Sequence, residues 1–303
     1  MKEDEANDPI LKFSDLTIER SLGFGERDIG LRKVSMEVDR SSVCALIGES
    51  GSGISLLARC LVGPLPPRTK VISGGIDFEG NDLLSLSRAK RQELRRRRLS
   101  FVGRRGEEVF DPRKTVRQSL EDYAGPGTGG WKKVSELDWS DCFYRAGIVE
   151  PERVLPRRIA DLSLLTVQRI AIVRALLVQA DVLICDHATE NLDRVAEAQF
   201  LDLVRQLSSD GGLTILMATG SPRGMEEVAD EVSVFYEGGI LESGSATSLL
   251  RSPSKLYTRE LLACVPHFSD HPRELPTISR EAITEAEEAI HGSSAVFESA
   301  ETG

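Results

Sequence analysis

Apolar residues occur in short runs separated by polar or glycine-containing turns, and this pattern predicts an α/β protein. Runs with the length of strands fall at residues 11–18, 33–38, 43–47, 75–78, 99–103, 182–186, 214–218 and 231–236. Helical periodicity is expected at 54–62, 195–207 and 222–228. Because strands alternate with helices, we expect a layered α/β core, and the closely spaced early strands indicate an added antiparallel sheet.

The middle and the end of the chain depart from this alternation. Between residues 115 and 179 the pattern is helical, with breaks at the glycine-rich stretch 125–130 and at Pro151 and Pro156. An α-helical subdomain inserted at about 113–178 is therefore predicted. From Pro266 onward proline, serine, glutamate and alanine predominate, so we expect a mobile tail with a helix-capable stretch at 279–291.

The most informative segment joins the strand predicted at 43–47 to the helix predicted at 54–62. Its eight residues are Gly48, Glu49, Ser50, Gly51, Ser52, Gly53, Ile54 and Ser55. They match the phosphate-binding pattern G-x-x-x-x-G-K-[S/T], except that Ile54 stands where the lysine is expected. In that pattern backbone N–H groups cradle nucleotide phosphates, and the lysine neutralises their charge. The segment therefore predicts an architecture built to bind ATP whose principal cation is missing.

Composition and charge exclude several other classes of protein. The 38 basic and 48 acidic residues give a net charge of −10, which argues against general nucleic-acid binding. No run approaches the roughly 20 apolar residues that span a bilayer, and the acidic first nine residues lack the layout of a signal peptide. The five cysteines are scattered without a Cys-x-x-Cys pair, which predicts reduced, buried thiols in a cytosolic protein.

Several segments, taken in order, resemble the ATP-binding subunits of ABC transporters, most closely those of oligopeptide, dipeptide and nickel importers. The phosphate loop is followed by 74–84, similar to the run G-x-I-x-F-x-G-x-D-L-L, and by 162–176, similar to the signature L-S-G-G-Q-x-Q-R-V-x-I-A-R-A-L. The strand predicted at 182–186 leads to Asn191-Leu192-Asp193, which resembles the Walker B strand followed by the D-loop. Residues 256–266 are similar to the peptide-importer ending Y-T-R-A-L-L-A-A-V-P.

This resemblance spans about residues 11–266 and implies a P-loop NTPase (RecA-like) core with an antiparallel β-subdomain and an inserted α-helical subdomain. It divides the chain into an N-terminal tail at 1–10, an ABC-type nucleotide-binding domain at 11–258, and a peptide-importer-type extension and tail at 259–303. It also implies membrane permease subunits as partners and a peripheral position on the cytoplasmic side of the plasma membrane. ATP and Mg²⁺ are the implied ligands, with Ser55 and Asp186 as Mg²⁺ ligands and Phe24, by position, beside the adenine.

The side chains that carry the chemistry of an intact family member are replaced in this chain. The replacements are Ile54 for the phosphate-loop lysine, Arg104 for the Q-loop glutamine, Leu164-Leu165 for the signature glycines, His187 for the glutamate after Walker B, and Gly220 for the switch histidine. The signature segment as a whole consists of Leu162, Ser163, Leu164, Leu165 and Thr166, and the D-loop retains Asp193.

Magnitudes indicate what these replacements do to catalysis. A charge-assisted hydrogen bond to phosphate contributes about 1.5–3 kcal/mol. Loss of a positioned base costs about 10²–10⁴ in rate, and loss of one transition-state donor about 10²–10³. These effects are not additive, but any combination predicts negligible hydrolysis at the chain's own site. In a head-to-tail dimer of such domains, the signature backbone of one chain contacts the γ-phosphate of the ATP held by its partner's phosphate loop. Leu164 and Leu165 place bulky side chains at that contact. The chain therefore affects one composite site through its phosphate loop and the other through its signature.

Other features have simpler interpretations. His187 is a candidate weak base because imidazole titrates near neutrality, but a solvated or core-satisfied imidazole is expected. The arginines at 95–98 lack interleaved aromatic residues and are interpreted as a solvated helix end. His267 and His271 have a metal-like spacing in a proline-rich segment, which is interpreted as incidental.

The sequence therefore predicts a catalytically degenerate ATP-binding subunit of a peptide-type ABC importer, retained as a structural or regulatory partner in a heterodimer with a second ABC ATPase subunit. Two alternatives remain open. One is a soluble ABC-like protein that regulates other proteins without a transporter, because Arg104, Arg105 and Gly106 replace Gln-Asp-Pro in the coupling segment. The other is an active ATPase that drives peptide import, in which Arg104 or Arg105 supplies the phosphate charge.

Overall fold

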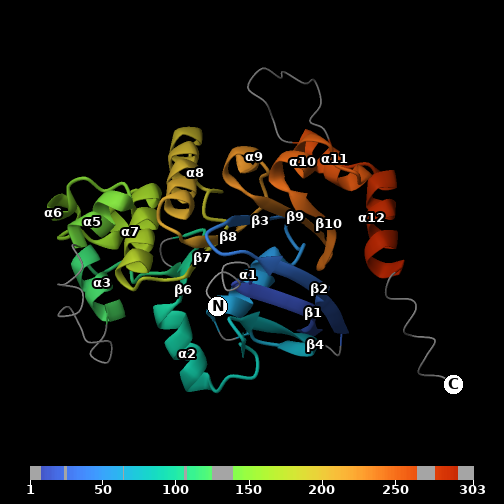
Figure 1. Cartoon of the computed structure of the whole chain (residues 1–303), viewed down its shortest axis with the longest axis horizontal. Helices are drawn as coiled ribbons and strands as arrows, with labels where there is room; N and C mark the ends of the chain where they lie inside the picture. The colour runs from blue at the N-terminus through green and yellow to red at the C-terminus, as the bar shows by residue number, and fades with distance from the viewer. Residues whose placement is uncertain are drawn as a thin grey trace, which may run out of the picture.

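Two β-sheets organise the computed structural model, which describes residues 8–23, 26–63, 65–105, 108–124, 139–264 and 277–292 (Figure 1). The larger sheet has the strand order β10-β9-β3-β8-β7-β6. Five of its strands run parallel to one another. In chain order they are β3 (Val43–Ile47), β6 (Leu99–Val102), β7 (Val182–Asp186), β8 (Thr214–Thr219) and β9 (Glu231–Tyr236). The edge strand β10 (Gly239–Ser245) runs antiparallel to β9. This mixed sheet confirms the α/β class predicted from the alternating pattern.

The smaller sheet is antiparallel, as the closely spaced early strands predicted. Its order is β2-β1-β4-β5, formed by β1 (Leu11–Gly23), β2 (Glu26–Val38), β4 (Thr69–Phe78) and β5 (Asn81–Asp82). Strands β1, β2 and β4 are longer than the apolar runs that predicted them, because their outer ends contain many polar and charged residues on a half-exposed sheet.

Strand β3 shows how one short sequence serves two cores. Its five residues are buried, and their side chains alternate between the faces of the sheet. Val43, Ala45 and Ile47 belong to the cluster shared with the helices, whereas Cys44 and Leu46 belong to the cluster shared with the antiparallel sheet and α1 (Ile54–Val62). The phosphate loop therefore leaves a strand that is fixed from both sides.

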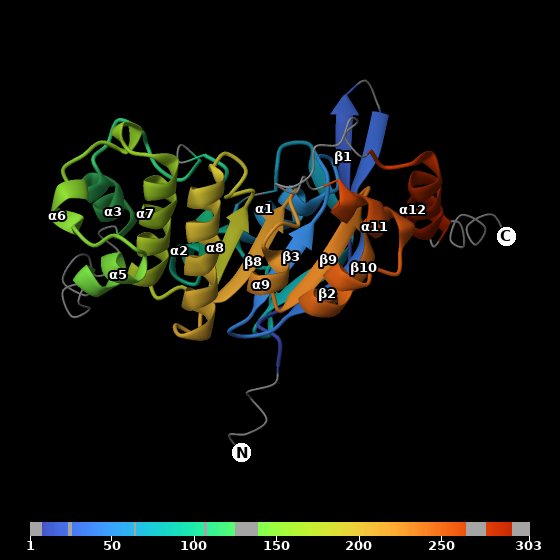
Figure 2. The same cartoon turned by 90° about the horizontal axis from the view of Figure 1, so that it is seen from above.

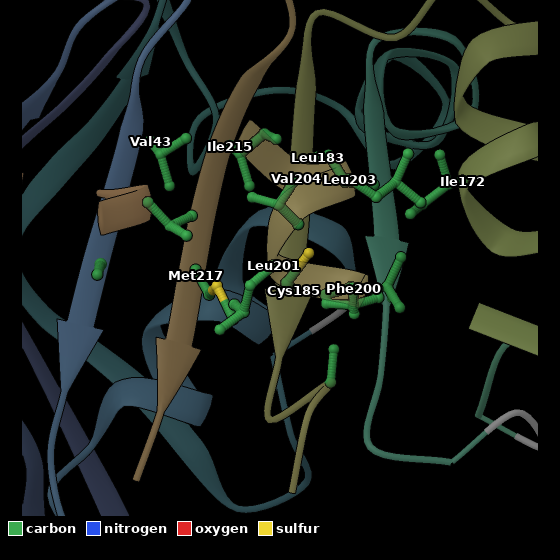
Figure 3. Packing of buried hydrophobic residues seen from close by; sticks show 14 of the residues in the cluster. Val43, Ile172, Leu183, Cys185, Phe200, Leu201, Leu203, Val204, Ile215 and Met217 are labelled. Atoms are coloured by element: carbon green, nitrogen blue, oxygen red, sulfur yellow. The ribbon is translucent and has the colours of Figure 1, made fainter. Parts of the chain in front are cut away.

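Helix α8 (Arg194–Ser209) covers one face of the large sheet. Asp193 caps it, since its side chain accepts hydrogen bonds from the N–H groups of Val195 and Ala196. Figure 3 shows residues of its apolar side packed against strand residues such as Leu183 and Ile215. The chain returns through α9 (Met225–Val228), which lies beside α8, and α10 (Ala246–Arg251), which contacts β9 and β10 (Figure 1).

The inserted helical subdomain gathers at one end of the molecule, away from the antiparallel sheet (Figures 1 and 2). In the described residues it comprises α3 (Val116–Ala124), α5 (Trp139–Arg145), α6 (Pro151–Val154), the 3₁₀ turn η3 (Ile159–Asp161) and α7 (Leu164–Leu177). Its glycine-rich break at 125–130 lies outside the described residues. Buried residues of α7 join this subdomain to the core, because Ile172 packs beside α8.

The end of the chain corrects one expectation. Residues expected within a mobile tail form α12 (Arg280–Gly292), which packs against α11 (Leu256–Ala263) and β10. Ala282, Ala286 and Ile290 recur at four-residue intervals and are buried, so one face of α12 belongs to the core. The remaining residues of the expected tail lie outside the described part of the chain.

The arginine run at 95–98, interpreted as a solvated helix end, is in part structural. It closes α2 (Arg88–Arg97), where Arg95 donates to the carbonyl oxygens of Leu61 (2.8 Å) and Cys60 (3.0 Å) at the end of α1. Burial lowers the pKa of Arg95 to about 10. Arg98 pairs with Glu79 and, at 2.5 Å, with Asp181. The interpretation was wrong for these two residues because it considered one helix alone.

Two expectations from composition agree with the structure. All five cysteines are free thiols, and all but Cys264 are buried. Burial raises the pKa of Cys185 to about 12, which makes it an unreactive core residue. Within the residues that the structure describes, no helix combines the length and apolar character needed to cross a membrane.

Candidate functional site

The phosphate loop has the backbone geometry that its glycines predict. Gly51 and Gly53 adopt φ values of 95° and 98°, a region that other residues rarely enter. The Ser52 N–H donates to the Glu49 carbonyl oxygen at 3.0 Å, and the Gly48 N–H donates to Thr219 at the end of β8 at 3.2 Å. The loop is thus a formed turn at the carboxyl end of β3, where α/β sheets bind ligands.

Ile54 begins α1 directly after the loop and is only 2% exposed. Its side chain belongs to the apolar cluster that also contains Leu57 and Ala58 of the same helix. An isoleucine side chain offers no hydrogen-bond donor and no charge. The position at which the resemblance expects a phosphate-binding cation is therefore occupied by a core residue.

Ser55 and Asp186, the predicted Mg²⁺ ligands, lie together. The Ser55 hydroxyl donates to Asp186 Oδ1 at 2.7 Å, and Arg59 Nε of α1 lies 3.6 Å from Asp186 Oδ2. The Asp186 side chain is 4% exposed, so these contacts satisfy a nearly buried carboxylate. The Asp186 carboxylate is thus satisfied within the chain by the Ser55 hydroxyl and the Arg59 guanidinium.

Ser55 and Asp186 are oxygen donors of the kind that Mg²⁺ takes together with waters and substrate phosphates. Arg59 also lies beside the Asp186 carboxylate. That these two residues hold Mg²⁺ stays a prediction. No cluster of three or more histidine, cysteine, aspartate or glutamate side chains that could hold a metal occurs in the described residues. Asp186 also lines a cavity of about 340 Å³ into which several arginine side chains face. The other lining residues are Ser55, Arg59, Arg104, Arg105, Glu108 and His187.

His187 follows Asp186 in a left-handed conformation, with φ 53°, and its N–H donates to the Ala218 carbonyl oxygen at 2.8 Å. Its side chain is 9% exposed, and Nδ1 is hydrogen-bonded to Glu190 Oε1. Nε2 lies 3.8 Å from Asp186 Oδ1. The imidazole is therefore held by neighbouring carboxylates, as the simpler interpretation of this residue expected.

Arg104, at the position of the Q-loop glutamine, reaches the same glutamate. Its Nη2 lies 2.9 Å from Glu190 Oε2, and the Arg104 carbonyl oxygen accepts a hydrogen bond from Asn191 at 3.5 Å. Gly220 also faces this group, because a Cβ added there would lie 3.4 Å from Glu190 Oε1 and 3.8 Å from the Gly48 carbonyl oxygen. The structure thus brings Arg104, His187 and Gly220 together around one carboxylate.

The signature segment lies apart from this cavity. Ser163 caps α7, with its hydroxyl accepting from the Thr166 N–H at 3.3 Å, and Leu162 and Leu165 pack partly against the helical core. Among the contacts between described residues, no hydrogen bond or ion pair joins Leu162–Thr166 to the phosphate loop. Gln168 of α7 does reach the region of Walker B, since its amide donates to the Ala188 carbonyl oxygen.

Sequence reasoning missed two residues of this site. Glu190 joins Arg104 to His187, and only its charge, opposite to that of Arg104, could have indicated the pairing. The hydroxyl of buried Tyr257 in α11 donates to Glu49 of the phosphate loop at 2.8 Å. No local pattern could have shown that contact across 208 residues of chain. Phe24, the candidate for stacking on adenine, lies outside the described residues.

Comparison with known proteins gives a consistent result. A family model described as "ABC transporter" matches residues 31–190. The oligopeptide transport ATP-binding protein AmiE of Streptococcus pneumoniae serotype 4 is 31% identical over 273 residues, which cover 89% of this chain and 76% of that protein. The dipeptide transport ATP-binding protein DppD of Bacillus subtilis is 29% identical over 249 residues, covering 82% and 74%.

Solved structures show the same fold. CbiO1 from Clostridium perfringens, part of the ABC transporter complex cbiONQ, gives a TM-score of 0.66 at 25% identity and covers 81% of this chain and 92% of its own. The post-hydrolysis dimer of the ATP-binding cassette MJ0796, bound to ADP and Pi, gives a TM-score of 0.64 at 20% identity. That match covers 78% of this chain and 98% of the other.

Proposed function

Because this chain belongs to the ABC transporter family of ATP-binding domains, we propose that it is the ATP-binding-type subunit of a peptide importer whose own catalytic site is degenerate. The observation that carries the proposal is the burial of Ile54, 2% exposed, at the position of the phosphate-loop lysine. An uncharged core side chain there leaves the loop without the cation that holds the terminal phosphates.

The surrounding residues support the loss of catalysis. His187 stands where a glutamate would polarise water, and its imidazole is engaged by Glu190. Gly220 has no side chain to offer at the switch position. A general base contributes about 10²–10⁴ in rate, so a site that also lacks the lysine is expected to turn over at background level.

The retained architecture supports a structural or regulatory role. Asp193 caps α8, and Gln168 ties the helical subdomain to the segment after Walker B. A chain that keeps this frame while losing the reacting groups suits a scaffold in a heterodimer with a second, active ABC ATPase subunit. We place this heterodimer on membrane permease subunits at the cytoplasmic side of the membrane. Like the relatives named above, it would serve transport of peptide-like substrates.

The proposal is tested by purifying the tagged chain from its source cells after mild detergent extraction. We expect co-purification of permease subunits and of a second ATPase subunit, with ATP hydrolysis that survives Ile54→Leu in this chain. Hydrolysis should disappear when the Walker A lysine of the second subunit is replaced by alanine. Association with no membrane protein, or steady phosphate release by the isolated chain, contradicts the proposal.

A second candidate function is regulation of other proteins without a transporter. One observation favours it: the coupling segment presents Arg104 to Glu190 within its own chain, at 2.9 Å, in place of a glutamine. Cell fractionation separates the two candidates, because a regulator of this kind stays in the supernatant after membranes are pelleted and co-purifies only with non-membrane proteins.

A further inference from the structure

Glu190 is the centre of a small ionic network that joins two separate segments of the chain. One carboxylate oxygen is hydrogen-bonded to His187 Nδ1, and the other lies 2.9 Å from Arg104 Nη2. Asn191 adds a hydrogen bond to the Arg104 carbonyl oxygen at 3.5 Å. We name these four residues, Arg104, His187, Glu190 and Asn191, the Glu190 clamp.

We propose that the Glu190 clamp holds the Q-loop segment, residues 101–105, against the segment between Walker B and the D-loop without any Mg-nucleotide. The inference rests on the proposed function, since it explains how a site without working phosphate ligands keeps a defined shape. The two segments lie at the carboxyl ends of β6 and β7, which are adjacent parallel strands, so the clamp spans the edge of the sheet at which ligands bind. In this chain an internal ion pair spans that edge.

Two positions that depart from the family pattern take part in this network, and a third borders it. Arg104 supplies the cation and His187 supplies the second hydrogen bond. Gly220 borders the same carboxylate, since a Cβ there would lie 3.4 Å from Glu190 Oε1, at ordinary contact distance. These positions belong to one site in the family pattern and therefore lie close together. What is particular to this chain is that Arg104 and His187 bind the same carboxylate.

The burial of these groups makes the network effective. The side chains of Arg104, Glu190 and His187 are 45%, 30% and 9% exposed, so the network runs from solvent into the protein interior. Ion pairs that are partly removed from water are screened less than fully exposed ones. Both carboxylate oxygens of Glu190 are engaged, which fixes its orientation as well as its position.

Hydrogen–deuterium exchange of the full-length chain tests the clamp. In the unaltered protein we expect exchange at residues 99–105 and 186–193 to be slow and to change by less than about twofold when Mg-ATP is added. Arg104→Gln should speed exchange in both segments by about twofold to fivefold, as expected for loss of a partly exposed ion pair. Exchange in the unaltered protein should also rise at 1 M salt, and that increase should be absent in Arg104→Gln.

Arg105→Gln is the matched control, because Arg105 lines the same cavity but its guanidinium pairs with no described residue. It should leave exchange unchanged. Exchanging the two charges, as Arg104→Glu with Glu190→Arg, should restore slow exchange in comparison with Arg104→Glu alone. A second single variant, Glu190→Gln, should speed exchange in both segments as much as Arg104→Gln does. Agreement between the two variants shows that the effect does not come from misfolding of one protein.

Either of two results would overturn the clamp: equal exchange in the unaltered protein and in Arg104→Gln and Glu190→Gln, or strong protection of both segments by Mg-ATP in the unaltered protein. Phosphate release is measured on the same samples. Because turnover decides the proposed function and exchange decides the clamp, failure of one is distinguishable from failure of the other.

Discussion

Restoring the phosphate-loop lysine by Ile54→Lys probes the central claim about this site. Ile54 is 2% exposed and packs in the apolar cluster between α1 and the sheets. Burial of an isoleucine side chain stabilises a protein by about 1.5–3 kcal/mol. The lysine stem recovers part of this packing, but its ammonium group must reach the cavity beside Asp186. We therefore expect the free energy of unfolding to fall by about 1–3 kcal/mol in the absence of nucleotide.

The same change should strengthen ATP binding without restoring hydrolysis. A charged hydrogen bond to phosphate is worth about 1.5–3 kcal/mol, which corresponds to roughly ten- to a hundredfold in affinity. Turnover should stay far below about 1 s⁻¹, the low end of ordinary enzymes, because His187 and Gly220 still lack the required groups.

Three measurements on one set of proteins check this reasoning. Urea unfolding gives stability, titration with a fluorescent ATP analogue gives affinity, and phosphate release gives turnover. Ile54→Leu is the control, since a volume-conserving apolar exchange should cost less than about 1.5 kcal/mol and leave affinity unchanged. Turnover at or above about 1 s⁻¹ in Ile54→Lys alone would refute the view that several catalytic groups are missing.

Three further predictions concern contacts that only the fold creates. Tyr257→Phe removes the hydroxyl that donates to exposed Glu49 and should lower the free energy of unfolding by about 1 kcal/mol in urea unfolding; no change would show that the contact contributes nothing. The hydrogen bond from Arg98 lowers the pKa of Glu79, so Glu79→Gln should destabilise at pH 7 by less than about 1 kcal/mol. That difference should begin to shrink as the pH falls below about 4.5, the ordinary glutamate pKa, and should vanish only below the lowered pKa of the folded state; thermal melts at a series of pH values below 7 check it. Ile290→Ala should cost about 2 kcal/mol because Ile290 is 7% exposed, whereas a freely moving tail would tolerate the change.

The regular parts of the fold could be predicted closely from the sequence. Strands β3, β7 and β9 begin and end at the expected residues, and α1 does so as well. Each of these strands is short and largely apolar between polar turns, so periodicity and chain breaks define it locally. The outer ends of β1, β2 and β4 were not predicted, because a half-exposed antiparallel strand carries charged residues whose place in a sheet depends on its neighbour.

Helix α12 and the arginine run show the limits of local patterns. The stretch at 279–291 was expected to be helix-capable, but its docking depends on α11 and β10, which no local pattern can supply. Likewise Arg95 looks like a surface charge along its own helix and becomes a cap only because α1 ends beside it. A side chain's partner is a property of the tertiary fold.

The sequence by itself determined the phosphate-loop turn and the α/β order of elements, because glycine conformations and apolar spacing act over a few neighbours. Only the tertiary structure decided that Ile54 is a core residue and that Glu190 joins Arg104 to His187. The reason is geometric: adjacent parallel strands bring residues 104 and 190 together across 86 positions of chain. Pairing of charges at that distance follows from the sheet and not from local spacing.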